Sequence, residues 1–206
     1  MRIESFTVGS LFTNMYIISN DLNEAIIIDP GMGLNKYIKS FKEKYDIKAV
    51  LLTHCHIDHI DGIEYFMDLP IYIHKNEYDN LFNDDINLYN MFYRTFKFNK
   101  GDLDIRLLSN NDILNILGFN IKVIYTPGHT SGSCCYLFDN KYLFSGDTLF
   151  NGTCGRCDFP SGNYSDMDKS LNYLVNNLDL SVIVYPGHND ITTIENELKY
   201  NMAIKR

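Results

Sequence analysis

The chain has 206 residues, of which 45% are hydrophobic and 14% aromatic, so it can fill a globular core and is neither disordered nor fibrous. Its formal net charge of −8 argues against a nucleic-acid partner, because phosphate contacts need clustered Lys and Arg. No apolar run approaches the roughly 20 residues that cross a bilayer, and the N-terminus lacks the apolar segment of a signal peptide. We therefore expect a cytoplasmic protein without membrane contact.

The first quarter of the chain combines strand-like runs with one helical pattern. Residues 5–19 and 25–31 are strand-like and are separated by the turn-forming sequence SNDLNE. Apolar side chains recur every three to four positions in residues 34–46, which predicts a helix. The continuous apolar run AVLLT then predicts a buried strand over residues 49–53.

The later elements alternate without the strict repeat of a doubly wound sheet. We expect strands at residues 71–74, 119–126, 133–138, 141–145 and 181–187, and helices at 63–68 and 165–178. This order favours an α+β fold of two packed sheets with helices outside. No repeat, low-complexity tract or linker divides the chain, so residues 1–206 are expected to form a single domain.

The least regular segment is residues 78–98, which mixes apolar and aromatic side chains with many Asn and Asp. It is open to two interpretations, a lid that covers the substrate and an amphipathic helix that packs on the core. The second is favoured.

The five cysteines cannot all pair within the chain, and without an export signal they are expected to be free thiols. Cys154 and Cys157 have the C-x-x-C spacing of a redox pair. However, they lie in the loop-like stretch TCGRCDFPSG rather than at the helix N-terminus that such a pair needs. We therefore expect free thiols there as well.

The stretch LLTHCHIDHIDG places three of the six histidines directly after the predicted AVLLT strand. His54 and His56 are two residues apart, which in extended backbone points both to one side and Cys55 to the other. Asp58 and His59 fall where the chain turns into a helix and can face the same cavity. Four ligands from one loop are too many for one tetrahedral zinc with an open position, but they suit two adjacent metal ions.

Three more residues of kinds that bind metal ions follow apolar strands elsewhere in the chain. His129 stands in FNIKVIYTPGHT, Asp147 in KYLFSGDTLF and His188 in SVIVYPGHND. In each case a glycine directly precedes the ligand type, which lets the backbone come close to a metal ion. We expect these residues to complete the metal site.

In this order, THCHIDH, PGHT, SGDTLF and PGH resemble the metallo-β-lactamase-fold hydrolases. Within them, GDTLFNGTCGRCDFPSGN and PGHNDITTIENELKYN are similar to the glyoxalase II (hydroxyacylglutathione hydrolase) group, especially its short bacterial members. The resemblance implies a four-layered αβ/βα sandwich with the metals at one edge. It assigns His54, His56 and His129 to one metal, Asp58, His59 and His188 to a second, and Asp147 to a bridge between them.

The resemblance implies two divalent metal ions, zinc or alternatively iron or manganese, that hydrolyse a thioester such as S-lactoylglutathione or a related acyl-thiol. Asp58 and a metal-bound hydroxide held by Asp147 would be catalytic. A thioester suits this site because its thiolate leaving group needs little protonation, while the metals activate water and polarise the carbonyl.

Long glyoxalase II enzymes bind glutathione largely through a C-terminal helical domain, and we expect no such domain within residues 1–206. Those enzymes also use a basic residue two positions before an aromatic one to hold glutathione. Here Arg156 offers the basic residue, but Asp158 stands in place of the aromatic one. Arg156 is therefore a candidate substrate-binding residue, and another thiol carrier is an alternative to glutathione.

Two other reactions share this fold by resemblance. A persulfide dioxygenase uses one iron with two histidines and a carboxylate, which would leave His56, Asp58, His59 and His188 without a role. A phosphodiesterase or nuclease also suits paired metals, but the acidic charge counts against it.

Five further polar residues have weaker signals. Asp29, in IIIDPG, either supports a ligand from behind or is an ordinary turn residue. His74 matches no ligand position and is expected on the surface or behind the ligands. Arg156 and Asp158 are expected to form a structural ion pair beneath the site, and Asp61 to be a first-turn charge of a helix.

Overall fold

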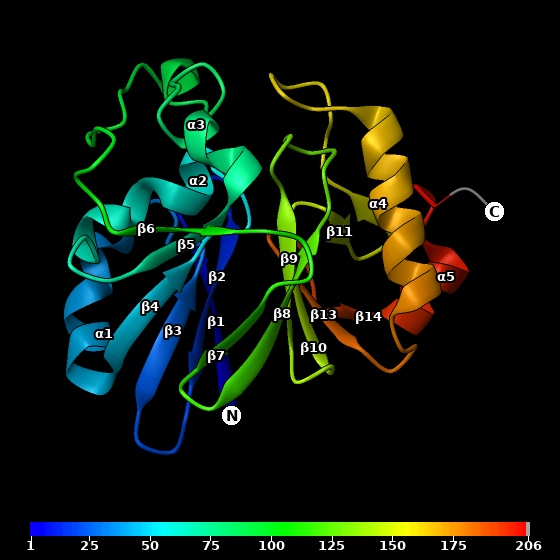
Figure 1. Ribbon diagram of the computed structural model, residues 1–206, viewed down its shortest axis with the longest axis horizontal. Helices are drawn as coiled ribbons and strands as arrows, with labels where there is room; N and C mark the ends of the chain where they lie inside the picture. The colour runs from blue at the N-terminus through cyan, green and yellow to red at the C-terminus, as the bar shows by residue number, and fades with distance from the viewer. Residues whose placement is uncertain (205–206) are drawn as a thin grey trace.

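The computed structural model describes residues 1–204, in which two six-stranded sheets pack against each other (Figure 1). The first sheet has its strands in chain order: β1 (Arg2–Val8), β2 (Thr13–Ser19), β3 (Glu24–Ile28), β4 (Asp46–Leu51), β5 (Ile71–His74) and β6 (Ile105–Leu108). The second sheet has the order β14 (Thr192–Thr193), β13 (Ile183–Pro186), β10 (Tyr142–Gly146), β9 (Cys134–Phe138), β8 (Phe119–Tyr125) and β7 (Ile113–Ile116). A small hairpin contacts the second sheet and comprises β11 (Leu149–Phe150) and β12 (Thr153–Cys154).

Strand direction brings several strand ends to one edge of the second sheet. Strand β9 is antiparallel to both β8 and β10, and β10 is parallel to β13. The strands β8, β10 and β13 therefore run the same way, and their carboxyl ends lie at the same edge. The segments that follow these three strands meet there.

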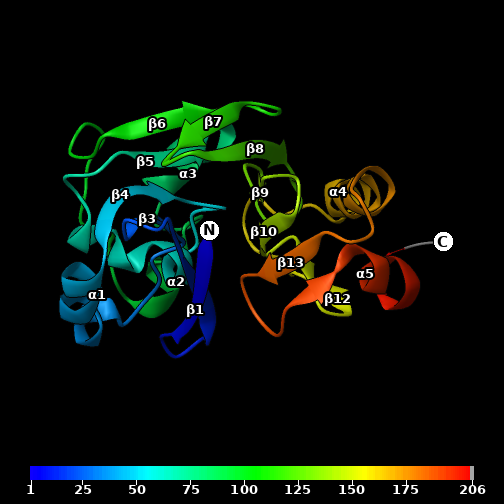
Figure 2. The ribbon, with the colours of Figure 1, turned by 90° about the horizontal axis from the view of Figure 1, so that it is seen from below.

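The helices cover the outer faces of the sheets (Figure 2). They are α1 (Ile38–Lys44), α2 (Ile57–Ile60), α3 (Tyr78–Leu81), α4 (Tyr164–Asn177) and α5 (Ile194–Tyr200), with 3-10 turns η1 (Leu34–Lys36), η2 (Asp61–Tyr65), η3 (Lys75–Glu77) and η4 (Asn90–Phe92). The helices α4 and α5 lie beyond the second sheet, whereas α1 lies beyond the first. Within residues 1–204 no helix combines the length and the apolar character that crossing a membrane would require.

Alternating side chains fill three apolar layers. In β2, Met15 and Ile17 point to the layer between the first sheet and its helices, while Tyr16 and Ile18 point to the layer between the sheets. A third layer lies between the second sheet and α4. The predicted α+β fold of two packed sheets with outer helices, a four-layered αβ/βα sandwich, is confirmed.

Local differences from the predicted elements concern turns and short elements. Residues 5–19 form two antiparallel strands because the chain reverses after β1, where Gly9 has a φ of 68°. The helix expected at 63–68 is instead the 3-10 turn η2, which begins at Asp61. The helix predicted over 34–46 begins as η1 and continues as α1. The strands β6, β7 and β14 and the helix α5 were not predicted, since each is short or weakly periodic.

The amphipathic helix expected over residues 78–98 is wrong, because only the single turns α3 and η4 form there. Asn and Asp side chains bond to nearby backbone groups instead and hold a compact irregular loop. Asn87 accepts from Tyr89 N–H and donates to the Leu81 carbonyl, and Asp84 accepts from Phe96 N–H. Leu81, Tyr89 and Phe96 are nevertheless buried against the first sheet and its helices.

Candidate metal centre

The segment after β4 presents His54 and His56 to one side, as the spacing predicts. Their ring centroids lie 4.8 Å apart, whereas Cys55 points into the apolar layer beneath the helices. The backbone N–H of Cys55 donates to Glu77 Oε1 at 3.0 Å. The two imidazoles therefore lie on a fixed backbone at the end of a buried strand.

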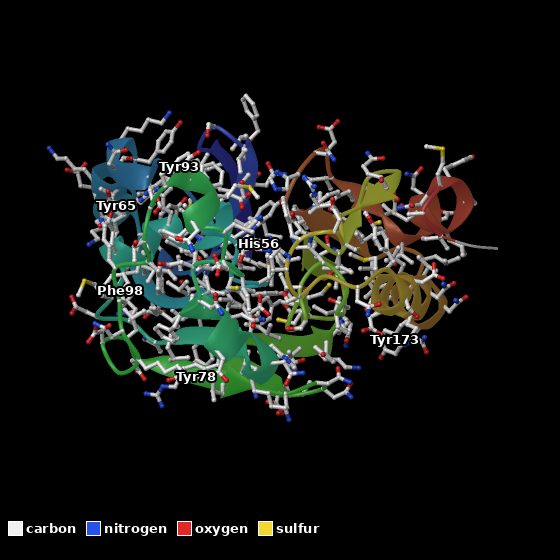
Figure 3. The ribbon with its side chains drawn as sticks, turned by 90° about the horizontal axis from the view of Figure 1, so that it is seen from above. His56, Tyr65, Tyr78, Tyr93, Phe98 and Tyr173 are labelled. Atoms are coloured by element: carbon white, nitrogen blue, oxygen red, sulfur yellow. The ribbon has the colours of Figure 1, made fainter. Side chains whose placement is uncertain are left out.

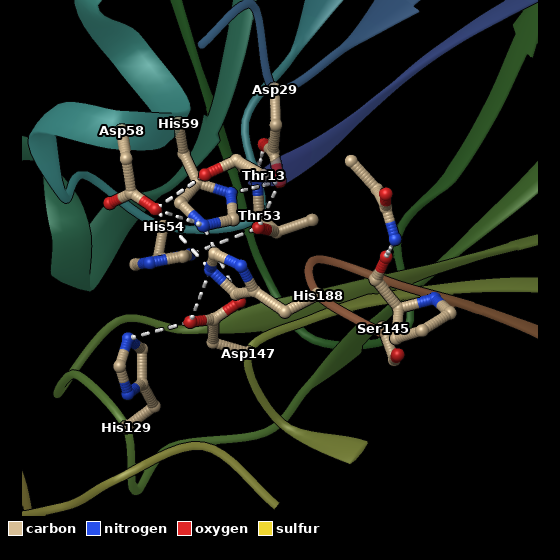
Figure 4. Close-up of polar contacts among 12 residues, drawn as sticks. Thr13, Asp29, Thr53, His54, Asp58, His59, His129, Ser145, Asp147 and His188 are labelled. Atoms are coloured by element: carbon tan, nitrogen blue, oxygen red, sulfur yellow. Dashed lines mark hydrogen bonds and ion pairs between the residues drawn. The ribbon is translucent and has the colours of Figure 1, made fainter. Parts of the chain in front are cut away.

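Asp58 and His59 lie on α2, which begins directly after His56. Asp58 Oδ2 accepts a hydrogen bond from Thr13 Oγ1 at 2.7 Å and lies 3.4 Å from His59 Nε2. The other ring nitrogen of His59 lies 2.9 Å from Asp29 Oδ2. The short helix thus holds both side chains toward the same space as His54, whose ring centroid lies 4.1 Å from that of His59 (Figure 4).

The second sheet contributes His129, Asp147 and His188, which follow β8, β10 and β13. Asp147 lies between the others, with Oδ2 3.5 Å from the Nε2 atoms of His129 and His188 and Oδ1 3.4 Å from His59 Nε2. A side chain at Gly187 would collide, since an added Cβ would lie 2.2 Å from Asp147 Oδ1. The glycine before His188 is therefore needed for close approach.

Within the described residues, the ligand-type atoms form two main groups whose members lie within 4.8 Å of one another. The histidine triad consists of His54, His56 and His129, and the mixed triad consists of Asp58, His59 and His188. Asp147 lies between the two triads. All seven residues singled out in the sequence are thus brought together in one place.

Asp29 forms a third group with His54 and His59, but its oxygens already have partners. Oδ1 accepts from Thr53 N–H at 2.8 Å, and Oδ2 lies within hydrogen-bond distance of Thr53 Oγ1 and His59 Nδ1. Such a contact fixes the orientation of the imidazole. Asp29 thus supports His59 from behind and is not an ordinary turn residue.

Several buried atoms of the site lack a hydrogen-bond partner. They are the Nε2 atoms of His54, His56, His59 and His129 and Oδ1 of Asp147. A buried polar atom left unpaired costs about 1–3 kcal/mol, so five in one cluster require compensation. Imidazole nitrogens and carboxylate oxygens are ligands for divalent metals such as zinc, and the arrangement fits two such ions.

Burial and charge set the protonation of the site. Burial, together with the neighbouring histidines, lowers the pKa of His54 and His56 well below its usual range, which leaves both imidazoles neutral. Burial acts in the same direction on His59, but Asp58 and Asp147 outweigh it and raise that pKa well above its usual range. Burial opposes ionisation of Asp147, yet the adjacent His59 holds its pKa at about 2. Metal binding needs neutral imidazole and ionised carboxylate, so His54, His56 and Asp147 are already in their ligand forms, whereas His59 must release a proton when a metal binds.

Sequence reasoning did not identify Glu77, which is fully buried and connects two ligand loops. Its Oε1 accepts from the N–H between His54 and His56, while Asn80 Nδ2 donates to Oε2 at 3.1 Å and to Ser131 Oγ at 2.9 Å. An added Cβ at Gly132 would lie 2.2 Å from Oε2. Glu77 was detectable as another polar residue shortly after an apolar strand.

Thr13 and Asn14 were missed as well. Thr13 donates to Asp58, and Asn14 Nδ2 donates to the carbonyls of Pro186 and Asn189 on either side of His188. The signal was a pair of polar residues that open the otherwise apolar stretch TNMYII. β2 thereby positions Asp58, which follows a strand of the first sheet, and the segment around His188, which follows a strand of the second.

The remaining predicted residues lie around the site. His74 is not a surface residue: it is 2% exposed and stacks on Tyr125 at 4.3 Å, away from the ligands. Arg156 and Asp158 form the expected ion pair, but the position expected beneath the site is wrong, because the side chains are 57% and 48% exposed. Asp61 opens η2 and pairs with Arg94. The five cysteines are free thiols.

A cavity of about 420 Å³ opens above the ligands. Five of the seven clustered residues line it, namely His56, Asp58, His129, Asp147 and His188. Its volume lies within the range of small-molecule sites. A small substrate can therefore reach the cluster.

A sequence model described as the Metallo-beta-lactamase superfamily matches residues 8–188. The chain belongs to this superfamily. Hydroxyacylglutathione hydrolase GloC of Haemophilus influenzae is 30% identical over 208 residues, which cover 98% of this chain and 96% of GloC. Among solved structures, BLEG-1 B3 metallo-beta-lactamase has a TM-score of 0.87 and 33% identity, with 98% of both chains covered. TTHA1623 in a di-iron-bound form has a TM-score of 0.80 and 29% identity, covering 97% of this chain and 98% of that one.

Membership of the metallo-beta-lactamase superfamily agrees with the His and Asp clusters, which are suited to divalent metals. The chain is a metal-dependent hydrolase of this superfamily. The matches to GloC and BLEG-1 each cover 98% of this chain. The superfamily match over residues 8–188 spans all seven clustered residues.

Proposed function

We propose that the protein hydrolyses thioesters at a pair of divalent metal ions, with zinc as the first candidate and iron or manganese as alternatives. The histidine triad would hold one ion, the mixed triad the other, and Asp147 would lie between them. Bound there, the ions would lower the pKa of a water molecule to about 7 and polarise a carbonyl group. The di-iron form of TTHA1623 supports iron as an alternative.

The chain's own residues orient the reaction. Asp58 and Asp147 both line the cavity, so a carboxylate is available to accept a proton from the attacking water. Thr13 fixes one oxygen of Asp58, and Gly187 lets Asp147 approach the mixed triad. These contacts hold the proton acceptors in place before the substrate enters.

The observation that favours a thioester is the lack of a dedicated proton donor for the leaving group, beyond a carboxylate that has taken the proton of the attacking water. Apart from the clustered histidines and Arg156, the described residues that line the cavity carry no side-chain N–H, O–H or S–H group. An alkoxide or amide anion would need a proton to depart, whereas a thiol with a pKa near 8.5 leaves as thiolate. The 30% identity to GloC, a hydroxyacylglutathione hydrolase, supports the same class.

The test uses purified protein loaded separately with zinc, iron and manganese, with metal content measured by elemental analysis. Thiol release from S-lactoylglutathione and from simple acyl thioesters is then compared with cleavage of a β-lactam, cleavage of a phosphodiester and oxygen uptake with glutathione persulfide. We expect thioester hydrolysis to exceed the other reactions and to require two ions per chain. Oxygen uptake with iron and no thioester cleavage with any metal would overturn the proposal.

A further inference from the structure

The cavity above the ligands has an apolar wall contributed by three separate parts of the chain. Leu11 comes from the turn between β1 and β2, and Phe150 and Phe159 come from the segments after β10. The irregular segment 78–98 adds Leu88, Met91 and Phe92. Figure 3 places Tyr93 of this segment and Tyr173 of α4 on opposite sides of His56. The ligands thus form a polar base, and the walls above it are largely apolar.

Two of these wall residues are exposed. Leu11 is 42% and Met91 55% exposed, and their neighbours Phe12 and Tyr93 are 72% and 98% exposed. Large apolar side chains that gather at a cavity mouth are a common feature of ligand-binding sites. An apolar ligand group at this mouth would remove them from water, which is favourable.

The same cavity is poor in positive charge. Arg156 is the one Lys or Arg among the described residues that line it. Its Nε and Nη2 donate to Asp158 at 2.6 Å, and its guanidinium carbon lies 3.9 Å from the Phe159 ring centroid. The carboxylates of glutathione or the phosphates of a nucleotide carrier would therefore meet a cation that already has an acidic partner.

We infer that the preferred substrate is a thioester whose acyl group is an apolar chain of several carbons and whose thiol carrier is uncharged. This inference rests on the proposed thioester hydrolysis. Water adds its oxygen to the carbonyl carbon, the C–S bond breaks, and the products are the carboxylate, the thiol and one released proton. The acyl chain extends from the ligand cluster along Leu11, Met91 and Phe92.

The experiment measures kcat/KM for S-acetyl-, S-butyryl- and S-hexanoyl-N-acetylcysteamine and for S-lactoylglutathione on metal-loaded protein. We expect kcat/KM to rise about threefold to fourfold per added methylene, as burial of each methylene predicts, and S-lactoylglutathione to be a poorer substrate than the hexanoyl thioester. A second measurement needs no metal: binding of the S-ethyl and S-hexyl thioethers of N-acetylcysteamine to metal-free protein should show the same preference for length.

The variants L11S and M91S should flatten the dependence of kcat/KM on acyl chain length, because each removes apolar surface from the proposed acyl wall. The matched controls L180S and M67S replace side chains that are 46% and 45% exposed and do not line the cavity, so the length dependence should remain. Thioester hydrolysis that is equal for all chain lengths, or fastest with S-lactoylglutathione, overturns the inference and leaves the proposed function intact. Absence of all thioester hydrolysis in protein with two bound ions overturns both.

Discussion

The two triads offer similar imidazoles in different electrostatic surroundings. In the histidine triad, His54 and His129 have neutral partners behind them, the Thr53 hydroxyl at 3.0 Å and the Arg156 carbonyl at 2.6 Å. In the mixed triad, His59 lies between Asp58 and Asp29. The mixed triad therefore compensates more of the charge of a divalent ion.

The triads also differ in exposure. The residues of the histidine triad are at most 2% exposed, whereas the His188 side chain is 22% exposed. Neutral ligands in a buried place leave a cation's charge poorly screened, which strengthens its pull on a carbonyl oxygen. An ion held by the histidine triad would therefore polarise a carbonyl more strongly, whereas the mixed triad would mainly supply negative charge and a proton acceptor.

The variant D147N should have the largest effect, because it should weaken metal binding at both triads. A neutral amide cannot replace the carboxylate that lies 3.4–3.5 Å from histidines of both triads. Substitution of a residue that only supports a metal ligand lowers activity by up to roughly 100-fold. D147N should lower thioester hydrolysis by more than this, and both ions should bind more weakly. Equilibrium dialysis with elemental analysis measures this, and two ions held with unchanged affinity would contradict the role of Asp147.

Variants that should abolish metal binding at one triad come next in size of effect. H188A should reduce the metal content from two ions to about one, because the mixed triad loses a ligand while the histidine triad stays complete. H129A should likewise leave about one ion, now in the mixed triad. Cobalt substitution with absorption spectroscopy distinguishes the two remaining sites, and identical spectra for the two variants would refute two separate sites.

Changes behind the ligands should weaken one triad at a time. T13V removes the hydroxyl that donates to Asp58, and E77Q places an NH₂ group where an oxygen accepts from Cys55 N–H or Asn80 Nδ2. Each should lower metal affinity about 10- to 100-fold, T13V in the mixed triad and E77Q in the histidine triad. The exposed substitutions T95V and E43Q serve as matched controls and should have no effect. Equal weakening of both triads by either variant would mean that the two halves are not supported independently.

A smaller effect lies outside both triads, at His74. Burial, with Lys75 adding to it, lowers the pKa of His74 to about 4, whereas the unfolded value is about 6.5. Between these values the unfolded chain binds more protons, so the free energy of unfolding falls as pH drops from 6.5 to 4, by up to about 3 kcal/mol. H74F keeps the stacking on Tyr125 but cannot titrate, and should show a flatter dependence.

Urea unfolding of metal-free wild type and H74F at pH 7.5, 6 and 5 tests this prediction. The ligand histidines are common to both proteins, so the difference between their pH slopes reports His74 alone. Parallel slopes would show that His74 does not titrate differently in the folded and unfolded chains.

The smallest effect is expected at the cysteines. Burial raises the pKa of Cys154 and holds that of Cys157 at about 11, so neither is an effective thiolate at neutral pH. C154S and C157S should keep metal content unchanged and activity within a few-fold. Loss of metal or of activity in either variant would restore a redox or ligand role for the pair.

Much of the centre was predictable because ligand types followed apolar strands. His129, Asp147 and His188 are widely separated in sequence, but each stands after a strand of the same direction, and strand patterns are visible in the sequence. The packing of the two sheets could be predicted for the same reason. The direction of the Cys55 side chain could be predicted from the two-residue period of extended backbone.

The support behind the ligands was harder to predict. The Thr13 hydroxyl bonds Asp58, 45 residues away, and Glu77 bonds the backbone 22 residues away, so no local pattern connects them. The burial of His74 depends on its stacking on Tyr125 from the other sheet, which only the folded chain provides. The helix predicted over residues 78–98 does not form, because hydrogen bonds from Asn and Asp side chains to the backbone compete with those of a helix.

The first sheet supplies four of the seven clustered residues and the second sheet supplies three, so the centre also acts as a cross-link between the two halves of the sandwich. Any ion bound there stabilises the docked sheets by mass action, and the folded population therefore depends on the supply of metal. Chelation should lower the melting temperature and speed hydrogen exchange at the ligand edge more than at the opposite edge. Metal starvation would then limit the amount of this protein in a cell as well as its activity, because the metal-free chain unfolds more often and is open to proteolysis.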